Sequence, residues 1–304
     1  MEAKMRGCTP QGDYLRGNGS RTVGWGMVRA MPPAHRPVGD LLREWRQRRR
    51  LSQLELALEA HVSARHLSFL ETGRSQPSRE MLLLLARRLE VPLRERNTLL
   101  VAAGYAPIYR ERSLDDPALA AAREAMHLVL AGHEPSPALA VDRHWNLIAA
   151  NRALAPLLEG LDAALLQPPV NVLRLSLHPA GLAPRILNLP QWREHLLSRL
   201  RHQVDASADD SLAALLQELE GLPLPASAHD VELSHGDAGG FVVPLRLQVG
   251  EHILTFLSTT TLFGTPMDVT LAELAIESFF PADAETAAVL AALNPRVPVQ
   301  GDLR

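Results

Sequence analysis

Residues 51–78 constrain the fold of this chain more than any other stretch. Ser52, with Glu55 three positions later, forms a capping box, which predicts that a helix begins there. Residues 61–63 form a turn, and Ser63 is placed to cap a second short helix. Two short helices joined by a tight turn therefore explain almost every position of this stretch.

The pattern extends to a domain of five helices over residues 37–103. Gly73 ends the second short helix as a C-terminal cap. Two further helices follow, one beginning after Ser78 and one covering about residues 93–103. The helix before the stretch has apolar residues at helical spacing, at Val38, Leu41, Leu42 and Trp45.

The outward face of the second short helix carries groups that can read bases. An arginine such as Arg65 can donate two hydrogen bonds to guanine, worth about 1–3 kcal/mol of discrimination. His66 and Ser68 can donate to bases or phosphates. Phe69 can contact a thymine methyl group or pack against a neighbouring helix, and the sequence leaves both open. The DNA-contact candidates are Gln53, Ser63, Arg65, His66, Ser68, Phe69, Arg74 and Arg79.

Three of these candidates, Gln53, Arg74 and Arg79, are expected to contact DNA phosphates. Gln53 lies at the N-terminus of the first short helix, where free N–H groups and the helix dipole attract anions. Arg74 and Arg79 lie in and after the following loop. Glu71 would be repelled by DNA, so we expect it to be structural and paired with Arg46.

This stretch closely resembles the Xre-type helix-turn-helix domains of bacterial and phage repressors. The resemblance implies that Gln53, Arg65, His66 and Ser68 contact DNA. The chain departs from the family at His61, where Gly is usual, although histidine tolerates positive φ better than most residues. The matching pieces are Leu51-Ser52-Gln53, Leu56-Ala57, Val62-Ser63, Leu67-Ser68, Leu70-Glu71, Gly73 and Pro77-Ser78.

Charge is unevenly distributed along the chain, although its net charge is only -3. Residues 36–96 hold 13 Arg against 8 Asp and Glu, whereas residues 113–293 hold 9 Arg against 22 Asp and Glu. The basic segment suits DNA phosphates, and DNA would repel the acidic one. The alternative is that both are ordinary solvated surfaces.

Residues 104–116 are interpreted as a linker and residues 117–293 as a second domain. Gly250-Glu251 predicts a hairpin between its last two clear strands. Residues 269–280 are interpreted as a strand followed by a helix. Helices together with an antiparallel sheet predict an α+β fold. The expected helices cover residues 117–131, 154–166, 192–204 and 211–220, and the expected strands cover 138–141, 146–150, 231–233, 241–249 and 252–261.

The second domain resembles the MmyB-like ligand-binding domain, which is found behind an Xre-type domain in other regulators. The resemblance implies a PAS-like domain that binds a small apolar ligand, with a fatty acid as the best guess. Among the pieces that carry it are Asp142-Arg143-His144-Trp145-Asn146, Asn171-Val172-Leu173-Arg174-Leu175 and Glu277-Ser278-Phe279-Phe280-Pro281.

Arg174 and His178 lie one helical turn apart and can hold a carboxylate, so they are the ligand-binding candidates. The alternative is that Arg174 is a surface ion-pair partner and that His178 caps a loop. We interpret Trp145 and Trp192 as core residues rather than as pocket lining.

Other function classes find little support. The chain has no Gly-x-Ser-x-Gly, His-Glu-x-x-His or Gly-x-Gly-x-x-Gly motif in the required context, so we expect neither an enzyme nor a metal or cofactor. Cys8 is the one cysteine, which excludes an internal disulfide. No apolar run reaches the roughly 18–20 residues of a membrane span, and no secretory signal is visible. We therefore expect a cytoplasmic protein.

Residues 1–36 are rich in Gly, Arg and Pro and predict a disordered tail. Residues 294–304 are interpreted as a C-terminal tail. If translation starts at Met27 or Met31, most of the N-terminal segment is absent from the native protein. The alternative is that this segment is a basic arm that contacts DNA.

These features together predict a sequence-specific transcription regulator that binds double-stranded DNA under the control of a small apolar ligand. We expect a homodimer, because one helix-turn-helix reads only a half-site. The alternative is a constitutive repressor whose second domain serves only dimerisation.

Overall fold

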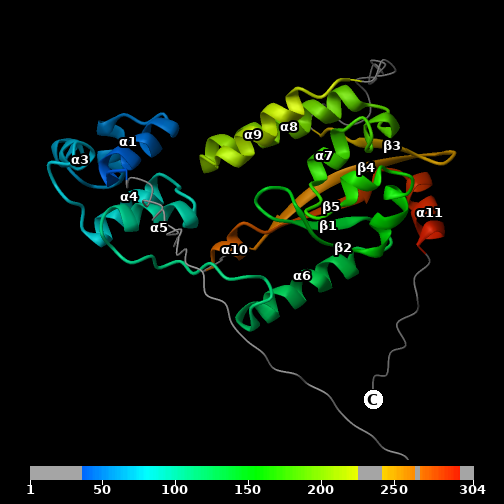
Figure 1. The fold of residues 1–304 in the computed structure, drawn as a ribbon, viewed down its shortest axis with the longest axis horizontal. Coiled ribbons are helices and arrows are strands. Elements are labelled where there is room, and N and C mark those ends of the chain that lie inside the picture. Colours follow the sequence, from blue (N-terminus) through cyan, green and yellow to red (C-terminus); the bar gives the residue numbers. More distant parts are fainter. Residues whose placement is uncertain (1–35, 225–241, 264–267, 295–304) are drawn as a thin grey trace, which may run out of the picture. The chain divides into compact units, whose positions relative to one another are not determined.

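The computed structural model describes residues 36–224, 242–263 and 268–294 (Figure 1). Nearly all of the two predicted tails, and the predicted strand over residues 231–233, lie outside these ranges.

The first domain has the five predicted helices. Three of them begin at a serine whose Oγ accepts a hydrogen bond from the N–H three residues later, and these serines are Ser52, Ser63 and Ser78. Ser52 also has the reciprocal bond from its own N–H to Glu55, so the predicted capping box is confirmed. The helices are α1 (Val38–Arg48), α2 (Gln53–Glu59), α3 (Ala64–Glu71), α4 (Arg79–Arg88) and α5 (Leu93–Ala102).

The turns on either side of α3 both use the left-handed backbone. His61, between α2 and α3, has φ +54°, which is the strain expected where a glycine is usual. Gly73 follows α3 with φ +71°. Its N–H donates to Leu70 O, and the Arg74 N–H donates to Phe69 O, which together cap the helix end as predicted.

Helices α1 and α3 approach each other closely at Gly39. A Cβ added to Gly39 would lie 2.5 Å from the carbonyl oxygen of Leu70 and 2.7 Å from that of Glu71. The helices pack around leucines that have almost no solvent exposure, including Leu56, Leu67 and Leu70. The first domain therefore has its own close-packed core.

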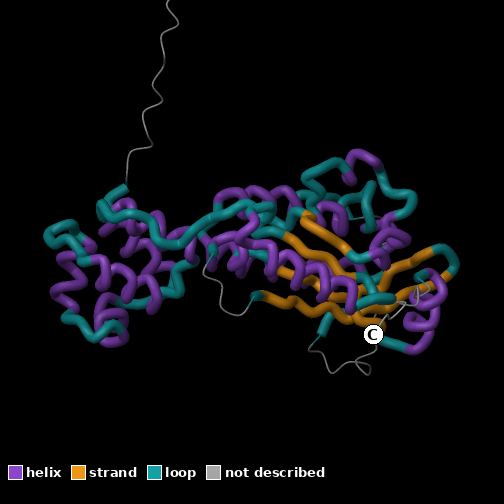
Figure 2. The backbone as a smooth tube through the Cα atoms, turned by 90° about the horizontal axis from the view of Figure 1, so that it is seen from below, coloured by secondary structure: helices purple, strands orange, loops and turns teal. Residues whose placement is uncertain are grey.

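The second domain is built on one antiparallel sheet of five strands in the order β2-β1-β5-β4-β3, and the predicted α+β class is confirmed (Figures 1 and 2). Gly250 turns the β3–β4 hairpin with φ +57°. The strands are β1 (Ala138–Val141), β2 (Leu147–Ala150), β3 (Leu245–Val249), β4 (His252–Leu262) and β5 (Ala275–Pro281). The α-helices are α6 (Ala120–Gly132), α7 (Val172–Leu177), α8 (Leu189–Ser207), α9 (Asp210–Glu220), α10 (Val269–Ala272) and α11 (Ala284–Leu293).

Helices cover both faces of this sheet (Figure 1). Leu139 of β1 faces the larger core, which includes Trp192 and Leu196 of α8. Ala140, the next residue, faces a smaller core that includes Met126 of α6. Because successive side chains of a strand point to opposite faces, β1 is buried along its whole length.

Three predicted elements are wrong or displaced. Residues 154–166 form two 3-10 segments, Arg152–Leu158 and Ala163–Leu166, and Pro156 within the first is incompatible with a continuous α-helix. Residues 269–280 have the predicted order reversed, with the short helix α10 first and the strand β5 second. The strand predicted from residue 241 begins at Leu245. Helices α7 and α11 were not predicted.

Candidate functional site

The candidate DNA-reading surface is organised around a buried ion pair. Glu71 accepts hydrogen bonds from Arg46 Nε at 2.6 Å and Nη2 at 2.8 Å, and its side chain is only 1% exposed. The predicted Arg46–Glu71 pair is therefore confirmed, and pairing raises the pKa of Arg46. Gln53 Nε2 donates to the same carboxylate at 2.8 Å, so Glu71 also fixes the side chain at the start of α2.

The outward side of α3 carries the predicted base-reading residues. Arg65 is exposed, whereas His66 and Ser68 are partly buried. Phe69 is partly buried, with the guanidinium carbons of Arg65 and Arg74 at 5.3 and 5.9 Å from its ring centroid. Phe69 thus holds two arginines by cation–π contact, while contact with a thymine methyl group stays a prediction.

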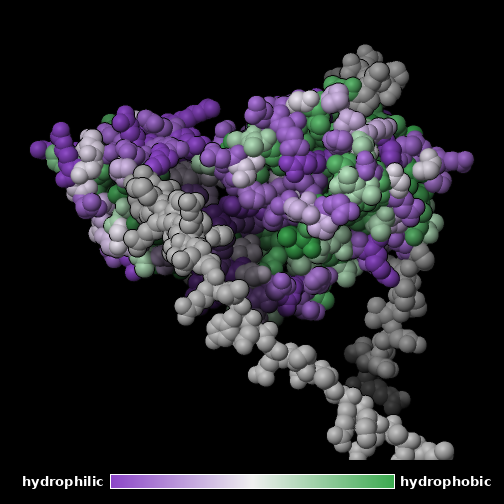
Figure 3. Space-filling model, viewed as in Figure 1, coloured by the Kyte–Doolittle hydropathy of each residue, from purple (hydrophilic) through white to green (hydrophobic). Residues whose placement is uncertain are grey.

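The other two DNA candidates lie at helix starts. Ser63 uses its hydroxyl oxygen as the cap of α3, accepting from the His66 N–H at 3.1 Å. Arg79 is exposed at the first position of α4. On the face seen in Figure 3, hydrophilic side chains predominate over the first domain, whereas apolar and polar side chains are mixed over the second.

The second domain contains a partly open apolar cavity of about 90 Å³ between the sheet and helices α7 and α8. Trp145 and Trp192 are buried core residues, as predicted, but both also line this cavity. The remaining lining is mostly leucine from β1, β2, β3, α7, α8 and the segment Arg152–Leu158, with Phe256 of β4. Ser176 is a polar lining residue, and its Oγ accepts from Trp192 Nε1 at 3.0 Å.

A second ion pair lies at the cavity wall. Arg199 of α8 donates to Glu277 of β5 from Nη2 at 2.7 Å and from Nη1 at 3.3 Å. Thr260 accepts from Arg199 Nη2 and donates to Glu277, both at 2.8 Å. Arg199 also lies over the Trp145 ring, 5.0 Å from its centroid. One turn before it on α8, burial and the charge of Arg199 lower the pKa of His195, although Glu277 acts in the opposite direction.

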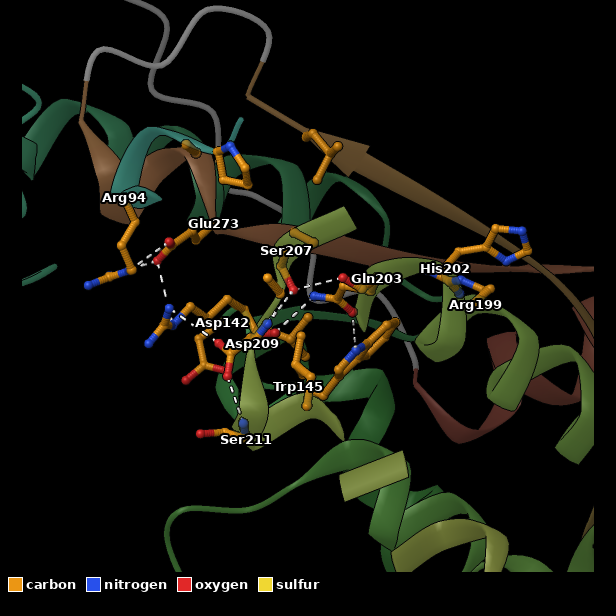
Figure 4. Close-up of a pocket in the computed structure, with 18 of the residues that line it drawn as sticks. Arg94, Asp142, Trp145, Arg199, His202, Gln203, Ser207, Asp209, Ser211 and Glu273 are labelled. Carbon is orange, nitrogen blue, oxygen red and sulfur yellow. Dashed lines mark hydrogen bonds and ion pairs between the residues drawn. The ribbon is translucent and has the colours of Figure 1, made fainter. Parts of the chain in front are cut away.

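An open cleft of about 770 Å³, with many charged residues in its lining, shares Trp145, Arg199 and Glu277 with the cavity. Trp145 and Arg199 are labelled in Figure 4. Trp145 Nε1 donates to Gln203 Oε1 at 2.7 Å, and Gln203 Nε2 donates to the Arg143 carbonyl at 2.9 Å. These bonds fasten the turn between β1 and β2 to α8.

Charged groups continue along this cleft. Arg143 lies 3.3 Å from Asp209 and 3.9 Å from Glu273. Arg94 of α5 donates two bonds of 2.9 Å to Glu273, which raises the pKa of Arg94 (Figure 4). Burial alone would raise the pKa of Asp209, but hydrogen bonds from His144 and a backbone N–H lower it. An ion pair between Arg94 and Glu273 therefore joins helix α5 to the second domain.

The predicted ligand residues lie elsewhere. Arg174 forms two 2.6 Å hydrogen bonds with Glu218 of α9, and His178 Nδ1 accepts from the Ala180 N–H at 3.0 Å. Neither residue is among the described residues that line the cavity. Their ligand role stays a prediction, and the geometry favours the alternative of a surface ion pair and a loop cap.

Sequence reasoning missed the charged pair that does line the cavity. Arg199 and Glu277 are 78 positions apart, so no local motif contains both. A signal was nevertheless present, because Glu277 lies between Ala275 and Phe279, which share the cavity-side face of β5. A carboxylate at an inward position of an apolar strand needs a partner.

Comparison with known proteins identifies both parts of the chain. Residues 122–293 match the MmyB-like transcription regulator ligand binding domain, and residues 42–96 match a helix-turn-helix family. The chain belongs to the MmyB-like transcription regulators. This MmyB-like protein is thus a DNA-binding regulator with a ligand-binding domain, and both resemblances are confirmed. The exact domain boundaries stay predictions.

The crystal structure of the clp gene regulator ClgR from Corynebacterium glutamicum is 30% identical to this MmyB-like protein. The match covers 32% of this chain and 90% of that chain, with a TM-score of 0.20. No curated protein matches significantly.

None of the helices in the described ranges has the length and apolar character needed to cross a membrane. No group of three or more His, Cys, Asp or Glu in those ranges is placed to hold a metal ion.

Proposed function

We propose that this regulator binds its DNA site as a homodimer, with α3 of each copy in a major groove. The observation that carries this proposal is the exposed Arg65 of α3, held over Phe69 beside the buried Arg46–Glu71 pair. Such a held guanidinium is suited to a guanine. Gln53, Arg74 and Arg79 are the proposed phosphate contacts, and the site of action is the cytoplasm.

We further propose that the second domain binds a small, largely apolar molecule in the cavity behind Trp145 and Trp192. The leucine-rich lining supports an apolar ligand. Compounds with a long alkyl chain, fatty acids among them, are the first to test. The cavity of about 90 Å³ is smaller than the ~150 Å³ apolar cavity that accepts benzene, so a longer chain requires the walls to move.

Wall movement gives ligand binding a way to affect DNA binding. Trp145 lines the cavity and is joined through Gln203 to the Arg143 backbone. Arg143 lies beside Glu273, which holds Arg94 of α5. For regulation, the ligand must bind the DNA-competent and DNA-incompetent arrangements with different affinity.

The DNA-binding proposal is tested by selecting binding sites from random duplexes and then measuring affinity by fluorescence anisotropy. We expect Arg65→Ala to lose about 1–3 kcal/mol on the selected site and to relax preference at one base pair. Arg88→Ala, which removes an exposed arginine from the end of α4, is the matched control and should keep the preference. A uniform loss across all sequences would make Arg65 a phosphate contact instead.

The ligand proposal is tested by native mass spectrometry of the purified full chain, followed by denaturing extraction. A dimer that carries a small apolar compound would support both the homodimer and the ligand. A ligand that binds tightly but leaves operator affinity unchanged would favour the constitutive repressor.

A further inference from the structure

The polar wall of the apolar cavity carries no net charge. Arg199 and Glu277 are the charged residues among the described residues that line it. They are joined by two hydrogen bonds, and Thr260 bridges them. The Glu277 side chain is only 5% exposed, so Arg199 is the counter-charge that permits its burial.

We propose that this pair selects ligands whose polar end is neutral and can both donate and accept a hydrogen bond, such as a primary alcohol or an amide, over carboxylates. The inference rests on the proposed function, because it names the head group of the apolar ligand assigned to this cavity. It makes Arg199 and Glu277 the specificity-determining residues.

A carboxylate head group fits this wall poorly. To approach Arg199 it must compete with Glu277, which already accepts bonds from both Nη1 and Nη2 of the guanidinium. If it displaces Glu277, a buried carboxylate loses its partner. If it does not, two carboxylates share one guanidinium at close range.

A hydroxyl or amide group avoids both costs. Its oxygen accepts from Arg199, and its O–H or N–H donates to Glu277, whose bond from Nη1 is the longer one at 3.3 Å. The ion pair then stays intact. The apolar remainder lies against Trp145 and the leucines of the cavity.

The test is isothermal titration of the full-length protein, at a pH where carboxylic acids are ionised, with two matched ligand series. One consists of hexan-1-ol, hexanamide and hexanoate, and the other of the ten-carbon equivalents. We expect the alcohol and the amide to bind at least about tenfold more tightly than the acid. Equal or tighter binding of the acid overturns the head-group inference and leaves the apolar-ligand proposal standing. Absence of binding by every compound overturns both.

The variant Glu277→Gln removes the negative charge of the side chain but almost preserves its shape, so it tests the effect of the charge alone. Removing the negative charge leaves Arg199 free to pair with an anion, so the affinity for the acid should rise about tenfold while that for the alcohol changes little. Glu218→Gln is the matched control, because Glu218 makes the same kind of bond to Arg174 outside the cavity lining, and it should leave the preference unchanged. A folded E277Q protein without any gain for the acid contradicts the inference. If E277Q does not fold, the wild-type series still decides.

Discussion

Glu71 and Glu277 are both buried carboxylates that an arginine holds through two hydrogen bonds, yet their surroundings differ. Glu71 lies in a close-packed helical domain and also fixes Gln53. Glu277 lies at the wall of a cavity. The first pair therefore supports the DNA-reading surface, whereas the second forms part of the cavity wall.

Glu71→Gln is expected to lower the free energy of unfolding by about 3 kcal/mol, because it leaves the guanidinium of Arg46 buried without a counter-charge. Urea denaturation of the full chain, followed by circular dichroism, measures this loss. Glu218→Gln removes a half-exposed partner of Arg174 and should cost no more than about 1 kcal/mol. Equal losses in the two variants would contradict a structural role for Glu71.

Glu95 gives a pH-dependent prediction. Burial raises its pKa above the ordinary value of 4.5, although the charges of Arg143 and Arg94 act against this shift. A carboxyl with a raised pKa in the folded state stabilises the fold below its unfolded pKa, and this contribution is lost as the pH rises through the folded pKa. Glu95→Gln should therefore be more stable than wild type at neutral pH, and the advantage should disappear in acid. Calorimetric Tm values at both pH values test this, and a pH-independent difference would refute it.

At the scale of elements, the packing of α1 on α3 depends on the absence of a side chain at Gly39. Helix propensity alone favours alanine over glycine by about 1 kcal/mol. Here a methyl group would collide with two backbone carbonyls, which cannot move without displacing α3.

Gly39→Ala is therefore expected to destabilise the protein by about 1–3 kcal/mol and to weaken DNA binding by shifting α3. Gly132→Ala is the control, because a Cβ there meets no atom within 4 Å at the end of α6. It should be neutral or slightly stabilising. Thermal unfolding of both variants tests this prediction. A stabilised Gly39→Ala protein would show that the contact between α1 and α3 is looser than described.

Local signals predicted the elements of the first domain well. Serine caps, Gly73 and apolar spacing each act within a few residues, so the five helices and the Arg46–Glu71 pair follow from the sequence. In the second domain, residues 269–280 are short and apolar, and periodicity alone does not distinguish a buried helix from a strand there. Pairing with β1 and β4 makes residues 275–281 a strand.

The difference between local and long-range signals also explains which candidate site residues the sequence predicted. The DNA-reading candidates all lie within residues 53–79, from α2 to the start of α4, so their spacing in the sequence was sufficient to propose them. The cavity wall depends on sheet register and on the placement of α8, which bring Arg199 to Glu277. Arg174 and His178 were chosen for their local spacing, which contains no information about which face of the domain is hollow.

At the scale of the whole molecule, the proposed regulator binds DNA with its first domain and binds its ligand with its second. The basic segment contains α3, and the acidic segment contains the cavity, so DNA attracts one and repels the other. The ion pair between Arg94 and Glu273, which has two hydrogen bonds, joins α5 to the second domain. Coupling between the two functions has to cross contacts of this kind.

Glu273→Gln is expected to keep basal operator affinity and ligand affinity while reducing the ligand-induced change in operator affinity by at least about fivefold. Glu111→Gln is the control, because Glu111 also bonds to Arg94 but belongs to the predicted linker and is largely exposed. Anisotropy titrations with and without ligand measure the change. If the two variants respond alike, the Arg94–Glu273 contact does not carry the signal.

The position of Glu277 also has an evolutionary consequence. Glutamate and glutamine codons differ by a single nucleotide, so one point mutation would remove the negative charge from the cavity wall while leaving the shape of the side chain almost unchanged. A lineage that carries this fold can therefore move between neutral and acidic effectors without rebuilding its sheet or its recognition helix.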